Sequence, residues 1–210
     1  DPSPVTAFGV YSGMKACAKE VFGDGSLKDR GVAVQGAGHV GYYLCRHLAE
    51  EGARVIITDI DKAKVQKIVD EFGAKAVAPE AIYAANADIF APCALGAVVN
   101  DDTLTQFKCK IIAGGANNVL AEERHGDALE KMGILYAPDY VINAGGLINV
   151  NAELVGWPPE RAKAKAGDIY DTLLRVFAIA KREKIPTYRA ADRLGEKRIE
   201  SVRRLKKTWI

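Results

Sequence analysis

The sequence predicts an α/β protein with a doubly wound parallel sheet and a C-terminal helical extension, and three observations support this prediction. Short apolar runs alternate with longer amphipathic stretches between about residues 31 and 143, which is typical of β-α-β units. A glycine-rich turn at residues 36–41 joins the first apolar run to the first amphipathic stretch. From about residue 144 onward no further strand pattern appears, and the spacing becomes helical.

The elements follow in order along the chain. Ser3 and Pro4 predict a helix from Pro4 to Val21, with Ser3 as its N-cap. Continuous apolar runs are typical of buried parallel strands. They occur at Val32–Val34, Val55–Ile57, Asp88–Ala91, Ile111–Ala113 and Ile134–Tyr136. Apolar residues recur at every fourth position in residues 40–48 and 65–69, which predicts helices that pack on the sheet. Three helices are predicted at Gly145–Val155, Glu160–Lys184 and Arg189–Thr208.

Length and composition limit the class of protein. The 210 residues, 49% of them hydrophobic, suit one domain spanning residues 1–210. No apolar run approaches the roughly 20 residues of a membrane span, so we expect no membrane partner. The net charge of +2 and the absence of a recognisable basic motif argue against nucleic acid. The chain starts at Asp1, without an initiator Met or a signal pattern, and we expect a piece of a longer chain.

The cysteines indicate the compartment. Their four positions match no zinc pattern and no disulfide framework, so we expect no metal and a reducing, cytoplasmic location. They are Cys17, Cys45, Cys93 and Cys109.

The glycine turn carries the strongest chemical signal. A Gly-x-Gly-x-x-Gly pattern alone is weak, but this one follows a predicted strand and opens a predicted helix, as in the Rossmann arrangement. Gly36 permits the tight turn, Gly38 lets the backbone approach a pyrophosphate, and Gly41 lets helix and strand pack closely. The phosphates would then lie at a helix N-terminus. The candidate dinucleotide contacts here are Gly36, Ala37, Gly38, His39, Val40, Gly41 and Tyr42.

Asp59 ends the second predicted strand, where such folds place a carboxylate on the adenosine ribose. With Ile60 beside it, this residue favours NAD over NADP, because a 2′-phosphate would meet a negative group. The alternative is that Asp59 merely caps the helix beginning near Lys62. A flavin cofactor would share the glycine turn but would colour the protein yellow.

The other candidate groups are histidines and one cysteine. His39 lies inside the glycine turn, where the backbone usually faces the cofactor, and His47 and His125 are expected on helix surfaces. Cys93 follows a strand end and could act as a nucleophile. No base accompanies it, so a small residue that allows the cofactor to approach is the favoured interpretation.

Four segments carry a more specific resemblance. Residues 2–7, 90–96, 117–118 and 137–146, the last reading Ala-Pro-Asp-Tyr-Val-Ile-Asn-Ala-Gly-Gly, resemble the cofactor domain of the glutamate/leucine/phenylalanine/valine dehydrogenase family. The resemblance covers almost the whole chain. It implies NAD-dependent, reversible oxidative deamination of an amino acid to a 2-oxo acid and ammonia. Branched-chain, leucine-type substrates are favoured, with phenylalanine-type substrates as the alternative.

The resemblance also implies roles for individual residues. Thr6 and Asn143 would lie near the nicotinamide, and Asn117 near its ribose or the substrate. Cys93 and Ala94 would line the cofactor cleft. Leu147 and Val150 would form a wall of the substrate pocket, and their spacing of three places them on one helix face. Ordinary core packing is the alternative for these last two residues.

No catalytic residue is assigned to this chain. In the family the catalytic lysines and aspartate belong to a separate N-terminal domain, and no segment here matches those motifs. We therefore expect the isolated chain to bind NAD but to turn over slowly or not at all, and the full-length enzyme to be a homo-oligomer. A non-catalytic NAD-binding module is the competing hypothesis.

Overall fold

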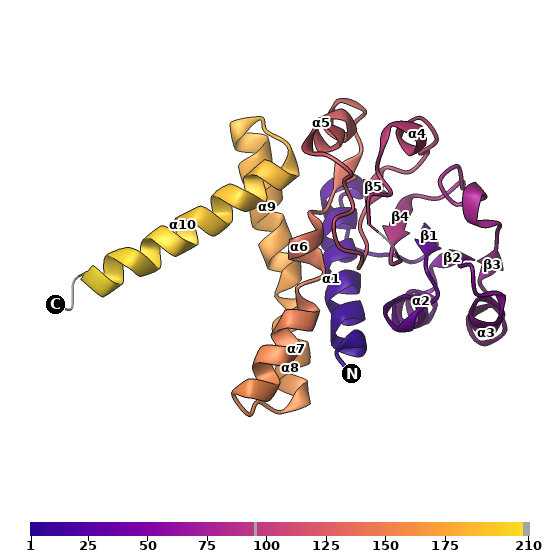
Figure 1. Ribbon diagram of the computed structural model, residues 1–210, viewed down its shortest axis with the longest axis horizontal. Coiled ribbons are helices and arrows are strands. Elements are labelled where there is room, and N and C mark those ends of the chain that lie inside the picture. Colours follow the sequence, from indigo (N-terminus) through magenta and orange to yellow (C-terminus); the bar gives the residue numbers. More distant parts are fainter. Residues whose placement is uncertain (95, 208–210) are drawn as a thin grey trace.

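The computed structural model describes residues 1–94 and 96–207 (Figure 1). Its centre is one sheet of six strands in the order β3-β2-β1-β4-β5-β6, and every pairing is parallel. The strands are β1 (Gly31–Gln35), β2 (Arg54–Thr58), β3 (Lys75–Ala76), β4 (Ile89–Pro92), β5 (Ile111–Ile112) and β6 (Leu135–Tyr136). The strand order reverses between β1 and β4, which is the topological switch point of a doubly wound sheet. The predicted fold class is confirmed.

Helices surround this sheet. They are α1 (Ser3–Phe22), α2 (His39–Glu51), α3 (Lys62–Phe72), α4 (Asp101–Leu104), α5 (Glu123–Lys131), α6 (Asp139–Ile142), α7 (Gly145–Leu154), α8 (Pro159–Gly167), α9 (Ile169–Glu183) and α10 (Thr187–Lys207), with a short 3₁₀ turn at Pro79–Ala81. The far end of α10 extends away from the rest of the molecule (Figure 1). Within the described ranges, no helix combines the length and apolarity that crossing a membrane requires.

The two faces of the sheet bury different clusters. Val32 and Val34 of β1 pack with α1, α2 and α9, whereas Ala33 between them packs on the opposite side with Leu129 of α5. The same alternation separates Ile111 from Ile112 in β5. Figure 1 shows α2 and α3 on one side of the strands and α4 and α5 on the other. Because both faces are covered, the continuous apolar runs in the sequence are accounted for.

Helix boundaries differ from the predictions in two places. Ser3 is not the N-cap of the first helix: it lies inside α1, Pro2 occupies the cap position, and the Asp1 carboxylate accepts from the Ser3 amide at 3.0 Å. The single helix expected from Glu160 to Lys184 is two helices, α8 and α9, separated at Asp168. Lys184, with φ of 54°, ends α9 in the left-handed conformation.

The bounds of the last helix and of five strands agree closely with the predictions, whereas one strand was not predicted. The expected helix over residues 189–208 corresponds to α10, and Thr208 lies outside the described residues. The five expected strands correspond to β1, β2, β4, β5 and β6, each within one or two residues. β3 was not expected, because both of its residues are exposed at the sheet edge and form no apolar run.

Candidate functional site

The turn between β1 and α2 requires glycine at two positions for steric reasons. Gly36 has φ of +111°, and a Cβ placed on it would lie 2.9 Å from the backbone of Cys93 and Ala94. A Cβ on Gly41 would lie only 2.0 Å from the carbonyl oxygen of Gly36. The backbone just after β4 therefore lies directly against the turn, and α2 starts as close to β1 as two backbones allow.

Gly38 has no such reason to be glycine. Its φ of −68° and ψ of −174° are open to any residue, and a Cβ there would meet no heavy atom within 4 Å. Gly38 is also the N-cap of α2, and no side chain caps that end. The first amides of a helix have no intrahelical acceptor, and they favour an anion. The open surface at Gly38 thus gives a phosphate direct access to the N-terminus of α2.

Asp59 lies at the end of β2 and binds the glycine turn. Its Oδ2 accepts from the Ala37 amide at 2.6 Å, and its Oδ1 accepts from the Asp61 amide at 2.9 Å. The cap of α3 is Asp61, whose side chain accepts from Ala63 and Lys64, so the alternative of Asp59 as that cap is wrong. Ile60, between the two aspartates, is 92% exposed.

A shallow cavity of about 300 Å³ adjoins the turn. His39, the first residue of α2, projects beside it with an 80% exposed side chain and its Nδ1 3.7 Å from the Asp1 carboxylate. Tyr42 lines the cavity too, and its hydroxyl donates to Glu71 of α3. The remaining lining residues are Asp1, Ala37, Gly38, Tyr43, Lys64 and Lys67. Val40 is half-buried and packs against the core.

The end of β4 forms the other side of the turn. The Cys93 amide donates to the Gln35 carbonyl at 2.7 Å, and the Gly115 amide lies 3.5 Å from the Cys93 sulfur. Burial raises the pKa of the Cys93 thiol to about 11, although the Gly115 contact acts in the opposite direction. Cys93 is therefore a protonated thiol at neutral pH, which disfavours a nucleophilic role. Ala94 is exposed next to Gly36.

Three residues predicted near the nicotinamide come from distant parts of the chain. Asn143 Nδ2 donates to Asn117 Oδ1 at 2.7 Å, so two loops are tied together by their amides. Thr6, in the first turn of α1, is 8% exposed, and its hydroxyl donates to the Pro2 carbonyl at 2.9 Å. Thr6 lies beside Gly145 and Gly146, which follow Asn143 and Ala144 in the chain. The fold thus places all three around the start of α7.

Leu147 and Val150 lie on the outer face of α7. They are 77% and 47% exposed, so the alternative of ordinary core packing is wrong. Leu154, one turn further along, is also exposed at 82%. An exposed apolar stripe of this kind marks a contact surface for a ligand or for another part of a protein.

Two histidines are not where the sequence suggested. His125 is only 1% exposed, and both of its ring nitrogens have partners: Nδ1 accepts from the Glu122 amide at the N-terminus of α5, and Nε2 lies 3.3 Å from Asp101. His47 is half-buried and packs on the rings of Phe8 and Tyr11. Both expectations of a helix-surface histidine are therefore wrong.

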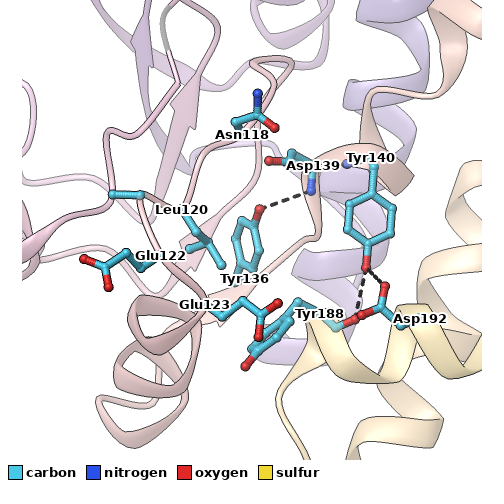
Figure 2. Close-up of a pocket in the computed structure, with 10 residues that line it drawn as sticks. Asn118, Leu120, Glu122, Glu123, Tyr136, Asp139, Tyr140, Tyr188 and Asp192 are labelled. Atoms are coloured by element: carbon cyan, nitrogen blue, oxygen red, sulfur yellow. Dashed lines mark hydrogen bonds between the residues drawn. The ribbon is translucent and has the colours of Figure 1, made fainter.

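A separate hollow of about 460 Å³ lies beyond β6, and none of the residues predicted from the sequence lines it (Figure 2). Tyr136, Tyr140 and Tyr188 surround it, and the Tyr140 hydroxyl donates to Asp192 at 2.7 Å. Asp139, also at its edge, accepts from the Val119 amide at 2.7 Å. Sequence reasoning gave Asp139 no role, although it lies in the Ala-Pro-Asp-Tyr motif: it anchors the loop that carries Asn117. Among the described residues, no group of three or more His, Cys, Asp or Glu could hold a metal ion.

The sheet order and the glycine turn define a Rossmann-type α/β domain. Comparison with known sequences then gives the family. The sequence model of the glutamate/leucine/phenylalanine/valine dehydrogenase family matches residues 2–61 and 54–206, and the chain belongs to this family.

Individual relatives agree with this assignment. The leucine dehydrogenases of Thermoactinomyces intermedius and Bacillus subtilis are 60% and 59% identical over the whole chain, which spans 57% and 58% of their lengths. The crystal structure of L-tryptophan dehydrogenase from Nostoc punctiforme is 47% identical with a TM-score of 0.94, over 97% of this chain and 62% of that one. A hetero-hexameric glutamate dehydrogenase from Thermus thermophilus, 24% identical with a TM-score of 0.76 over 97% of this chain and 53% of that one, shares the fold.

Proposed function

We propose that this chain is the NAD-binding part of an amino-acid dehydrogenase that reversibly deaminates a branched-chain L-amino acid to the 2-oxo acid and ammonia. The observation that carries the proposal is the open surface at Gly38, before the uncapped N-terminus of α2. It occurs in a chain 60% identical to a leucine dehydrogenase. The chain spans 57% of that relative, so the activity belongs to a longer protein.

The residues at the carboxyl edge of the sheet suit the successive parts of an NAD molecule. The amides after Gly38 would hold the pyrophosphate, with Gly36, Ala37, Val40, Gly41 and Tyr42 shaping the turn and His39 at its rim. Asp59 would accept from the adenosine ribose and would repel a 2′-phosphate, which favours NAD over NADP. Ile60 is exposed and would contact the adenosine, and the exposed Ala94 would line the cofactor cleft.

The other end of the cleft would position the nicotinamide and the substrate. NAD, when bound, accepts the hydride from the α-carbon of the amino acid. Thr6 and Asn143 would orient the carboxamide of the nicotinamide, and Asn143 is itself hydrogen-bonded to Asn117. Cys93 would line the cleft as a small, protonated side chain. Geometry of this kind raises rates by holding reacting groups in place.

Leu147 and Val150 would form one apolar wall for the substrate side chain. Identity of 60% to leucine dehydrogenase, against 47% to L-tryptophan dehydrogenase, supports a branched aliphatic substrate over an aromatic one. A methylene in such a pocket is worth only about 1–3 kcal/mol, so the opposite wall also contributes to the preference. We assign that wall, and the groups that transfer protons, to the part of the protein that this chain does not span. We also propose a cytoplasmic homo-oligomer.

The cofactor site is tested by measuring Kd for NADH, from its fluorescence, with wild-type protein and with the Gly38→Ala variant. The added methyl would occupy the approach of the pyrophosphate, and loss of one or two charge-assisted hydrogen bonds would raise Kd by about 10-fold or more. Gly195→Ala in α10 is the matched control, because a Cβ there also meets no atom within 4 Å. Gly195→Ala should unfold at or above the wild-type temperature, whereas Gly38→Ala should lose no more than about 1 kcal/mol, because alanine is a poorer N-cap than glycine. An unchanged Kd for Gly38→Ala would refute the proposed site.

Substrate turnover requires the longer protein. NAD reduction is measured with leucine, valine and phenylalanine, on this chain and on the full-length protein. We expect activity with leucine and valine only in the full-length protein. NADH binding without turnover in both would instead support a non-catalytic NAD-binding module.

A further inference from the structure

The short helix α6 leads directly into Asn143, which would orient the nicotinamide. The Asn143 amide donates to the Asp139 carbonyl at 2.9 Å, so the backbone of Asn143 is tied to the start of α6. A helix of one turn has little stability of its own, and its position depends on its contacts with other elements. The contacts of α6 therefore determine where the side chain of Asn143 lies.

Contacts at both ends of α6 attach it to the rest of the domain. At its first residue, the Asp139 carboxylate accepts from the Val119 amide at 2.7 Å, on the loop after β5. At its last residue, Ile142 is fully buried against α1, where a Cβ on Gly13 would lie 2.6 Å from the Ile142 side chain. A contact from the middle of α6 would oppose rotation of the helix about the line that joins these two ends.

Tyr140 makes such a contact, because its side chain joins α6 to α10. Its hydroxyl lies 2.7 Å from Asp192 Oδ1 and 3.0 Å from the carbonyl oxygen of Tyr188 (Figure 2). Burial and the hydrogen bond to Asp192 raise the pKa of Tyr140, so the hydroxyl keeps the proton that it donates. Hydrogen bonds from a hydroxyl to a carboxylate are stronger than those between neutral groups.

The first turns of α10 are a firm support for this hydroxyl. Tyr188 is buried, and so is Ala191, the neighbour of Asp192. The Thr187 hydroxyl donates to the Tyr136 carbonyl of β6 at 2.6 Å, which fixes the start of α10 to the sheet. Because this part of α10 is closely packed, its contact with Tyr140 restrains α6.

We propose that Tyr140 is a positioning residue, whose hydroxyl on α10 holds α6 so that Asn143 is in place before the nicotinamide binds. The inference rests on the proposed function, because it deepens the role of the same cleft. Without the hydroxyl, the ligand itself has to order α6 and Asn143, and this loss of conformational freedom weakens its binding. The pyrophosphate site at Gly38 lies on α2, and its contribution stays the same.

Binding of two ligands to Tyr140→Phe tests this role. NADH carries the nicotinamide, whereas ADP-ribose carries only the adenosine, the pyrophosphate and the second ribose. In Tyr140→Phe we expect Kd for NADH to rise about threefold to tenfold, as for loss of one hydrogen bond, and Kd for ADP-ribose to stay within about twofold. Asp192→Ala removes the charged acceptor and should also weaken NADH alone, which tests the contact even if Tyr140→Phe folds poorly.

Tyr188→Phe is the matched control on α10. It also removes a tyrosine hydroxyl that donates to an aspartate, Asp127 of α5 at 3.0 Å, and it leaves the Tyr188 carbonyl in place. Its Kd for both ligands should equal that of wild type. A loss of NADH binding as large as in Tyr140→Phe would show that any weakened contact of α10 has this effect, and the inference would be wrong.

A double-mutant cycle with Asn143→Ala supplies the stricter test. Because Tyr140 acts through Asn143, adding Tyr140→Phe to Asn143→Ala should change Kd for NADH by less than about twofold. An unchanged Kd for NADH in Tyr140→Phe, equal weakening of NADH and ADP-ribose, or additive effects in the cycle would overturn the inference. Wild type that binds neither ligand would instead refute the proposed function, and the inference with it.

Discussion

Replacing Asp59 by alanine should destabilise the protein even when no cofactor is present. The Asp59 carboxylate accepts from the amides of Ala37 and Asp61, at 2.6 and 2.9 Å. Ala37 is only 4% exposed, so water cannot readily replace the lost acceptor. A buried donor left unsatisfied costs about 1–3 kcal/mol, and the half-exposed Asp61 adds little to this. We therefore expect Asp59→Ala to lose about 1–3 kcal/mol of unfolding free energy, in addition to weakening NADH binding.

Urea unfolding followed by circular dichroism, without NADH, measures this loss. Asp59→Asn keeps one acceptor oxygen and should lose less than Asp59→Ala. Asp70→Ala is the matched control on α3, because within the described residues the Asp70 carboxylate accepts only from the exposed Gln66 side chain, and its effect should stay within about 0.5 kcal/mol. If Asp59→Ala unfolds at the wild-type urea midpoint, the carboxylate does not support the turn and the reasoning is wrong.

Three further predictions follow from local contacts. Burial raises the pKa of Glu51, but hydrogen bonds, led by Lys15, outweigh it and hold that pKa below its usual 4.5. Its contribution to stability is thus complete above about pH 4.5 and disappears as the pH falls through the lower folded-state value. Urea titrations at several pH values should show a flatter acid dependence for Glu51→Gln, and an unaltered slope would contradict this. Because burial raises the pKa of Cys93 to about 11, iodoacetamide at pH 8 should modify this cysteine slowly until the protein unfolds. Mass spectrometry of each cysteine measures the modification. Rapid labelling of Cys93 in the native protein would argue against a protonated thiol. Gly41→Ala should lower the unfolding free energy by about 1–3 kcal/mol or more, since its methyl would lie 2.0 Å from the Gly36 oxygen. Gly38→Ala meets no such contact and should cost less, no more than about 1 kcal/mol for a poorer N-cap. Equal melting temperatures for the two variants would contradict the steric argument.

Much of the fold could be predicted from the sequence because the strands are buried on both faces. Such strands are continuous apolar runs, and they identify β1, β2, β4, β5 and β6 directly. The edge strand β3 has two exposed residues, and only its pairing with β2 makes it a strand. The break at Asp168 between α8 and α9 also escapes prediction, because the helical spacing continues across it.

In the candidate site, too, some features could be predicted from the sequence and others depend on contacts between distant residues. The sequence pattern predicts separate roles for Gly36, Gly38 and Gly41, and the structure adds the backbone contacts that require glycine at Gly36 and Gly41. His125 was expected on the surface because its neighbours in sequence are polar, but it is 1% exposed and its Nε2 lies 3.3 Å from Asp101, 24 residues away. Sequence patterns report residue types along the chain, and partners at long separation are invisible to them.

The loops at the carboxyl edge of the sheet are fixed by side chains that already form hydrogen bonds within the chain. Asp59 binds the glycine turn, Asn143 binds the Asn117 loop, and Asp139 binds the amide of Val119 on that same loop. A ligand entering such a site has few groups to order, so little of its binding energy is lost to conformational entropy. At Gly38 the chain leaves space without a steric need of its own, because a Cβ there would meet no heavy atom within 4 Å. That contrast between fixed loops and an open glycine is the physical basis for placing the pyrophosphate of a dinucleotide at Gly38.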